Sequence, residues 1–387
     1  MEVPSGIANG EHYQPALLSL HCLERLVRKN LSCASLSLKL AERLTSFWPT
    51  IWSWIQLIHP FILNSKDFTL LFRLQAKNVA LFILRMFPRY DSLNDVIQNT
   101  SGVVTLIFEL WNLETQVYDF DPSNPQYSTA PAALTMNFYL PNLIEGDFEW
   151  HKASISAVGG SVIDVASVAL THLRHDAEQD SPEHSYTRIS MDVTMVSYLS
   201  SHISLRNAIL SQHSVLEITR VAVSLSSKEF SASACSHKIG SCLAVCFRYL
   251  LMHLTLGDVW TWTIQSLDSQ LLRAILASDP WQSQWNDEEI LLKLSDAITK
   301  NLTTRSVTLA AARAIKRVGA HELEKRFLRT GNGLLRKKWL ALKELIEERM
   351  LLIPSDDESR NRAILKSCGN HMVRWYNFIR CRLNLLR

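Results

Sequence analysis

Apolar side chains recur at intervals of three and four residues along most of the chain. This spacing gathers apolar side chains on one face of an α-helix, whereas a half-buried strand needs strict alternation. The pattern therefore predicts helices over residues 15–29, 35–47, 68–87, 103–113, 153–174, 216–226, 233–254, 260–276, 288–302, 307–328 and 333–352.

The connections between these predicted helices are mostly short, which favours antiparallel packing of helices that follow one another in the sequence. The chain holds 12 glycines and 12 prolines in 387 residues, fewer turn residues than an all-β fold of this length needs. No repeat of fixed length recurs, which excludes consensus ankyrin and tetratricopeptide arrays. We therefore expect an all-α fold, an irregular armadillo- or HEAT-like α-solenoid of about twelve to sixteen helices.

Two polar stretches interrupt the helical pattern. Residues 118–131 contain three prolines, and residues 176–186 are polar and acidic, so that a possible internal boundary lies at 176–187. We expect both stretches to be surface loops of one continuous helical unit over residues 14–353, because polar backbone is costly to bury. The polar residues 1–13 are expected to be disordered, and they lack the apolar core of a secretory signal.

No charged residue occurs between Arg43 and Lys66, a length that would suit a membrane span. However, Pro49 and Pro60 divide the apolar part, because proline interrupts the hydrogen bonding of a helix interior. The alternative is a short buried helix that begins at Pro49, where the missing N–H group costs nothing. We favour this alternative and expect no membrane partner.

The charged residues are almost balanced, with 40 lysines and arginines against 37 aspartates and glutamates and a net charge of +3. This balance does not by itself indicate nucleic acid or an acidic membrane surface as a partner. Apolar residues make up 47% of the chain, which is typical of a folded protein. The 7 cysteines, an odd number without a secretory signal, favour a reducing compartment, the cytoplasm or the nucleus.

The motifs of common catalytic sites are missing from the sequence. Neither a phosphate-binding Gly-x-x-x-x-Gly-Lys-Ser/Thr loop nor a Gly-x-Ser-x-Gly nucleophile turn occurs. His321 and Glu322 begin a metalloprotease-like helix, but Lys325 stands where the second zinc-binding histidine belongs. We therefore predict no catalytic residues, no bound cofactor and no enzymatic activity.

The densest group of metal-binding residue types comprises Cys235, His237, Cys242 and Cys246. On one straight helix these residues would lie along its length, so they could not surround a metal ion. Cysteine in such a stripe behaves as a small apolar side chain. We therefore expect the cysteines of this group to pack in the core.

Residues 313–349 carry 11 lysines and arginines against 5 acidic residues. One interpretation is a surface for an anionic partner, such as an acidic peptide or nucleic acid. The other, which we favour, is the solvated face of amphipathic helices whose glutamates pair with basic residues along the helix. If this segment binds a partner, we expect the contact at a cationic cluster beside an aromatic anchor, Arg336, Lys337, Lys338 and Trp339.

The C-terminal segment contains two fragments of a zinc-finger pattern. The sequence Cys368-Gly369-Asn370-His371 is followed by Phe378-Ile379-Arg380-Cys381. These fragments, placed behind a long helical region, resemble the fungal MYND-type zinc finger proteins. The resemblance implies that Cys368, His371 and Cys381 are the remaining metal ligands of a degenerate MYND-like tail over residues 354–387.

Two expected cysteines of that family's pattern are replaced, by Val373 and Asn384, and the chain ends before the later ligands. Two cysteines and one histidine do not complete the tetrahedral sites that zinc requires. The resemblance therefore implies common ancestry, with zinc as a cofactor only if the tail is a functional finger. The alternative is that the two cysteines belong to an unrelated basic terminal helix.

Two functions fit these observations. The first is a non-enzymatic protein-interaction scaffold whose helical repeats bind a protein or peptide partner in a groove. The alternative is a zinc-binding or nucleic-acid-associated regulator that acts through the basic C-terminal third and the MYND-like tail. We favour the scaffold over nucleic-acid binding, because no pattern of aromatic residues for base stacking accompanies the basic residues.

Overall fold

The computed structural model describes residues 13–30, 34–64, 70–87, 91–115, 132, 135–136, 139, 150–178, 182–228, 234–285, 289–319 and 322–353. Within these ranges every regular element is a helix, which confirms the predicted all-α fold. Residues 1–12 of the predicted N-terminal segment, the polar stretch 118–131 and the MYND-like tail 354–387 lie outside the described residues.

The described part of the chain contains seventeen α-helices and one 3-10 helix, more than the number expected. The difference arises because three predicted helices are divided and because four helices were not predicted, at Asp91–Gln98, Pro182–Leu199, Ile203–Ser211 and Asp279–Gln284. In chain order the helices are α1 (Tyr13–Asn30), α2 (Ala34–Asn64), α3 (Leu70–Met86), α4 (Asp91–Gln98), α5 (Val103–Thr115), α7 (Trp150–Val158), α8 (Val162–Glu178), α9 (Pro182–Leu199), α10 (Ile203–Ser211), α11 (Ser214–Ser226), α12 (Ala234–Thr255), α13 (Val259–Asp268), α14 (Leu271–Ala277), η2 (Asp279–Gln284), α15 (Ile290–Asn301), α16 (Arg305–Gly319), α17 (Glu322–Thr330) and α18 (Gly333–Leu351).

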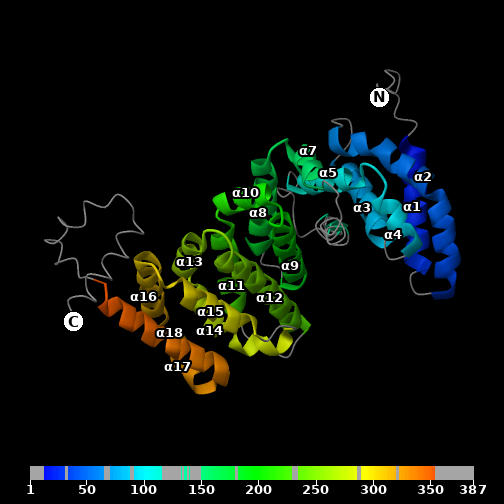
Figure 1. Cartoon of the computed structure of the whole chain (residues 1–387). Coiled ribbons are helices and arrows are strands. Elements are labelled where there is room, and N and C mark those ends of the chain that lie inside the picture. Colours follow the sequence, from blue (N-terminus) through cyan, green and yellow to red (C-terminus); the bar gives the residue numbers. More distant parts are fainter. Residues whose placement is uncertain are drawn as a thin grey trace.

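The helices follow one another from the N-terminal end of the molecule to the C-terminal end, and most pack on helices close to them in the sequence (Figure 1). At the N-terminal end α1 packs against α2 and α3. In the middle α12 packs against α9, α11 and α15, and at the C-terminal end α16 lies against α13, α17 and α18. One cluster of buried apolar side chains extends through these contacts.

Helix α2 runs without interruption through Pro49 and Pro60, so the prediction of a separate short helix beginning at Pro49 is wrong. Proline in a helix interior costs about 3 kcal/mol. Burial outweighs this cost, since Ile51, Ile55 and Ile58 on one face are at most 2% exposed. Fully burying one such side chain contributes about 1.5 to 3 kcal/mol.

The uncharged stretch between Arg43 and Lys66 thus forms the C-terminal half of α2, and its inner face belongs to the core cluster. No single helix among those described has both the length and the apolarity of a membrane span. Helices α7 and α8 reach that measure only when they are taken together, and a bend of 79° separates them.

This bend lies at a pair of glycines that divides the predicted helix over residues 153–174. Gly159 and Gly160 adopt φ angles of 153° and 88°. A Cβ atom on Gly159 would lie 2.9 Å from a carboxylate oxygen of Asp164, so only glycine fits this turn without a shift of its neighbour. The prediction of one continuous helix is therefore wrong at this position.

The possible internal boundary at 176–187 contains the end of α8 and the beginning of α9. Helix α8 packs against α9, and α9 packs in turn against α12. Some polar residues of this stretch are buried, since Asp176 is only 4% exposed. This junction therefore carries interior contacts as well as a surface connection.

Candidate functional site

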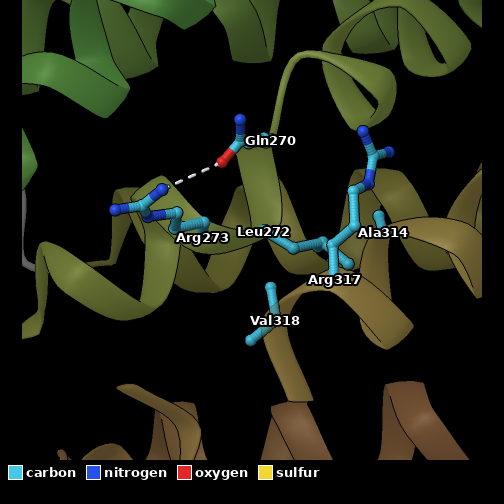
Figure 2. Close-up of a pocket in the computed structure, with 6 residues that line it drawn as sticks. All are labelled: Gln270, Leu272, Arg273, Ala314, Arg317 and Val318. Carbon is cyan, nitrogen blue, oxygen red and sulfur yellow. Dashed lines mark hydrogen bonds between the residues drawn. The ribbon is translucent and has the colours of Figure 1, made fainter. Parts of the chain in front are cut away.

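A surface notch lies where the turn between α13 and α14 meets α16 (Figure 2). Gln270 makes this turn in the left-handed conformation, with φ of 73°. That conformation costs a residue with a Cβ atom about 1 kcal/mol or more. Burial of the next two residues, Leu271 and Leu272, at no more than 1% exposure holds the turn in place. The prediction of one helix over residues 260–276 is therefore wrong at Gln270.

Apolar side chains form the floor of the notch, and arginines stand on opposite sides of it (Figure 2). Leu272, Ala314 and Val318 on the floor are each at most 3% exposed. Arg273 comes from α14, and Arg317 comes from α16. The notch is a shallow depression, open to solvent, with room for about one water molecule.

Hydrogen bonds to the end of α13 hold the side chain of Arg317 in place. Its Nη1 atom donates to the Asp268 carbonyl oxygen at 2.8 Å, and its Nη2 atom donates to the Leu267 carbonyl oxygen at 3.1 Å. The last carbonyl groups of a helix have no partner within that helix, and a cation there complements the helix dipole. Arg317 therefore caps α13 while 42% of its side chain remains exposed.

Two further arginines complete the charge of this region. The Nη2 atom of Arg313 lies 3.0 Å from both carboxylate oxygens of Asp268, and Arg273 Nη1 donates to the Gln270 amide oxygen at 3.2 Å. Three arginines against one aspartate leave two positive charges in excess. Guanidinium groups pair with carboxylate and phosphate groups through parallel hydrogen bonds. The notch is thus suited to an anionic group beside an apolar side chain.

The predicted interaction residues at the start of α18 do not form one surface. Trp339 is 3% exposed, and its Nε1 atom donates to Glu324 Oε1 at 2.9 Å. The expected aromatic anchor therefore lies in the core, whereas the preceding Lys337 and Lys338 are exposed. The reason is that successive residues of a helix point about 100° apart.

The basic residues beside Trp339 differ in their surroundings. The Nη1 atom of Arg336 donates to the Leu328 carbonyl oxygen at 3.2 Å, and Lys338 forms an ion pair with Asp296. Such surface pairs contribute only about 0 to 1 kcal/mol, so a partner could replace them. These residues remain a predicted contact, without the aromatic ring that the prediction included.

Glu324 joins α17 to α18 through its carboxylate group. Lys343 Nζ donates to the same Oε1 atom as Trp339, at 2.7 Å. Burial alone would raise the pKa of Glu324, but the hydrogen bonds from Lys343 and Trp339 lower it below its ordinary value. The ionised carboxylate therefore serves the packing of the two helices.

The predicted zinc ligands Cys368, His371 and Cys381 lie outside the described residues, so zinc binding by the tail stays a prediction. Among the residues that the structure covers, no group of three or more histidine, cysteine or acidic side chains is placed to hold a metal ion. Cys242 and Cys246 are fully buried in the core cluster, which confirms their predicted packing role, whereas Cys235 is only half-buried and lies outside that cluster.

Part of the notch could be predicted from the sequence. Arg313 and Arg317 belong to the basic segment, and their spacing of four residues places them on one face of a helix. Nothing in the local pattern marked the turn at Gln270, because glutamine seldom adopts the left-handed conformation. The contribution of Arg273, which precedes the basic segment, was therefore missed.

The notch and the all-α fold are the observations from which a function can be inferred. No family model, no curated protein and no solved structure matches the chain.

Proposed function

We propose that the chain is a non-enzymatic scaffold, an irregular armadillo- or HEAT-like stack of helices that binds an acidic peptide segment of a protein partner. The observation that carries this proposal is the placement of Arg273 and Arg317 on opposite sides of an apolar floor (Figure 2). Helices that stack mainly on their neighbours in the sequence are typical of solenoids, which bind partners along extended surfaces.

The size of the notch favours a peptide over a small-molecule cofactor. Sites for small molecules usually have about 300 to 1,000 Å³ and bury most of the ligand. The notch is a shallow depression with room for about one water molecule, so it does not enclose a ligand of that size. A peptide can lie across this depression so that an aspartate or glutamate pairs with an arginine on the rim.

The polar groups of the notch favour binding over catalysis. Arg273, Arg313 and Arg317 carry guanidinium groups, which stay protonated in proteins, and Gln270 carries an amide group. Neither type of group takes up or releases a proton near neutral pH, as general acid–base catalysis requires. The nearby carboxylate of Asp268 pairs with two of the arginines.

Nucleic acid is the alternative anionic partner. Proteins that bind single strands usually combine a row of basic residues with exposed aromatic rings on which bases stack. Trp339, the aromatic residue beside the basic cluster of α18, is buried. This placement favours an acidic peptide, which needs no stacking surface.

The proposal is tested with the full chain and a fluorescently labelled peptide of alternating glutamate and leucine. We expect fluorescence anisotropy to show binding that is lost when glutamine replaces each glutamate of the peptide. Arg273→Gln should weaken the affinity about tenfold or more, because a hydrogen bond to a charged group contributes about 1.5 to 3 kcal/mol. Arg273 is preferred for this test because Arg317 also caps α13.

Two variants with the same change in charge serve as controls. Lys39→Gln alters an exposed position on α2, and Lys337→Gln alters the predicted contact on α18. Equal affinity of all three variants and the unaltered chain would contradict binding at the notch. A loss confined to Lys337→Gln would instead place the contact on α18, and stronger binding of a labelled single-stranded DNA than of the peptide would favour nucleic acid.

A further inference from the structure

Two aspartates from neighbouring helices meet inside the molecule, where α8 packs against α9. Asp176 and Asp192 are each 4% exposed, and their carboxyl groups lie within reach of a hydrogen bond to each other. Among the described residues, no N–H or O–H group donates to the buried Oδ2 atom of Asp192. An ionised carboxylate only accepts hydrogen bonds, so two carboxyl groups can bond to each other only if one of them carries a proton. The contact between the two side chains therefore requires a proton in the protein interior.

The basic groups around this pair lie beside Asp176. From α9, Arg188 Nε is 3.6 Å from Asp176 Oδ2, and from α8, His175 Nδ1 is 3.2 Å from Asp176 Oδ1. Among the described residues, no lysine, arginine or histidine forms an ion pair with Asp192. The basic groups are therefore paired with Asp176 and not with Asp192.

The other helices packed around the pair add little positive charge near Asp192. From α5, Glu114 contributes a second negative charge, which its ion pair with Lys77 offsets at a Nζ–Oε1 distance of 2.9 Å. From α12, the thiol of Cys242 faces Asp192. His172 of α8 lies near Glu114 and Asp176, but burial lowers its pKa and keeps its ring neutral near neutral pH. Arg188 favours the ionised form of Asp192, but burial and the charges of Asp176 and Glu114 outweigh it and favour the neutral form.

We propose that Asp176 and Asp192 share one proton across the interface of α8 and α9, and that this interface is destabilised when the proton is lost. Loss of the proton would leave two carboxylates side by side with one arginine and one histidine at the outer end. Buried like charges repel strongly, because little water screens them. Burial and the neighbouring charge of Asp176 accordingly raise the pKa of Asp192 well above its ordinary value.

The location of the pair gives this proton a structural role. Helix α9 packs against α12, which packs in turn against α15, whereas α8 packs against α7 and α5 (Figure 1). The pair therefore lies at the junction between the N-terminal helices and the C-terminal ones. A change in its protonation acts on the contact that joins the two halves of the stack.

The direction of the pH effect follows from the raised pKa of Asp192. Between the ordinary aspartate pKa of about 3.9 and the higher native value, the folded chain holds one proton more than the unfolded chain. The unfolding equilibrium constant therefore increases about tenfold for each pH unit across this window. The proton on Asp192 stabilises the folded chain fully at a pH below this window. This stabilisation is lost once the pH rises above the native pKa.

The direct test is infrared spectroscopy of the full chain with ¹³C-labelled aspartate carboxyl groups at about pH 6, where ordinary aspartates are ionised. We expect the carbonyl stretch of a protonated carboxyl group, and we expect Asp192→Asn to abolish it. Asp279→Asn is the matched control, because burial also raises the pKa of Asp279, although its carboxylate accepts hydrogen bonds from Asn332 and Gln282. This control should retain the band of the pair.

A spectrum of the unaltered chain without this band overturns the proposal, whether or not any variant folds. The second measurement compares urea unfolding of the unaltered chain and Asp192→Asn from about pH 5 upward. An amide can donate the same hydrogen bond without titrating, so the tenfold dependence per pH unit should disappear in the variant. If Asp192→Asn does not fold, Asp176→Asn replaces it, and parallel pH profiles of the variant and the unaltered chain overturn the proposal.

Discussion

The Lys77 ammonium group donates a hydrogen bond to the Glu114 carboxylate at 2.9 Å, although both side chains are buried. The same Oε1 atom of Glu114 accepts a hydrogen bond from the backbone N–H group of Ala132 at 3.0 Å. Taking a charge out of water is costly, so a buried ion pair tolerates the loss of neither partner alone. Helices α3 and α5 therefore depend on each other through this pair.

Lys77→Met should lower the free energy of unfolding by about 3 to 5 kcal/mol, because Glu114 would remain buried without its cation. Urea unfolding of the full chain followed by circular dichroism measures this change. Lys39→Met, at an exposed position on α2, should change the same quantity by no more than about 0.5 kcal/mol. Equal stabilities of the two variants would show that the ion pair is not formed.

Trp339→Phe should destabilise the fold by about 1 to 3 kcal/mol, because the smaller ring removes both the hydrogen bond to Glu324 and buried volume. Thermal unfolding of the purified chain gives the comparison. The matched control is Trp260→Phe on α13, where the ring is 39% exposed and the effect should be small. If Trp339→Phe left stability unchanged but abolished peptide binding, Trp339 would be a surface contact after all.

Arg317→Gln should destabilise the fold more than Arg313→Gln, although both remove one positive charge from α16. Arg317 donates to two carbonyl groups at the end of α13, whereas Arg313 forms an exposed ion pair with Asp268. A hydrogen bond contributes about 0.5 to 1.5 kcal/mol and a cation at the C-terminal end of a helix about 0.3 to 1 kcal/mol, whereas exposed pairs contribute about 0 to 1 kcal/mol. Urea unfolding of both variants tests this order, and the reverse order would exclude the capping role.

Acid should weaken the fold through His253, which is 1% exposed and lies 4.4 Å from the Tyr249 ring between centroids. Burial, with a smaller effect from Arg206, lowers the pKa of His253 from 6.5 to about 4. The contribution of the neutral ring is complete above the unfolded pKa. It is lost as the pH falls through the native pKa, up to about 3 kcal/mol in all.

The corresponding measurement is urea unfolding of the unaltered chain and His253→Leu between about pH 4 and pH 7. The free energy of unfolding of the variant should fall less steeply as the pH is lowered, whatever its value at neutral pH. This pH effect has the opposite sign to the effect of Asp192, so the two groups can be separated in one set of titrations. If the free energy of unfolding falls equally with decreasing pH in both proteins, His253 is protonated in the folded state.

The purified full chain should contain no stoichiometric zinc. Cys368, His371 and Cys381 supply three ligands, whereas a structural zinc site takes four. Elemental analysis of the full chain, with and without residues 354–387, is the measurement. Zinc that is present in the full chain and lost with the tail would restore the functional finger that the MYND resemblance suggests.

The fold class could be predicted because apolar periodicity depends on many residues at once. Single residues decided what the pattern could not show. Gly159 and Gln270 end helices that the periodicity extends, because a turn depends on the φ angle of one residue. Pro49 had the opposite effect, since the burial of its neighbours kept α2 continuous through a residue that usually ends a helix. Local preference and tertiary packing compete at such positions, and the sequence alone does not give the outcome.

The candidate site was harder to predict than the fold, for a similar reason. Four consecutive residues at the start of α18 were expected to act together, yet a helix directs Lys337 to solvent and Trp339 to the core. Arg273 and Arg317 are 44 positions apart in the sequence. They border the same notch only because α14 and α16 pack together. Spatial groups of this kind follow from the packing of helices, which periodicity does not specify.

Two cysteines of α12 are buried, so their reaction with a thiol reagent reports when the centre of the molecule opens. Cys22 on α1 is exposed, whereas Cys242 and Cys246 are fully buried. A thiol is alkylated as the thiolate, and the hydrogen bond that the Cys242 thiol donates to Cys246, together with burial, raises the pKa of Cys242 well above its ordinary value. An alkylating reagent will therefore mark Cys22 at once, and Cys242 and Cys246 only when α12 separates from its neighbours, whereas Cys235 of the same helix is half-buried. The interval between the two modifications measures how often the centre of the molecule opens in solution.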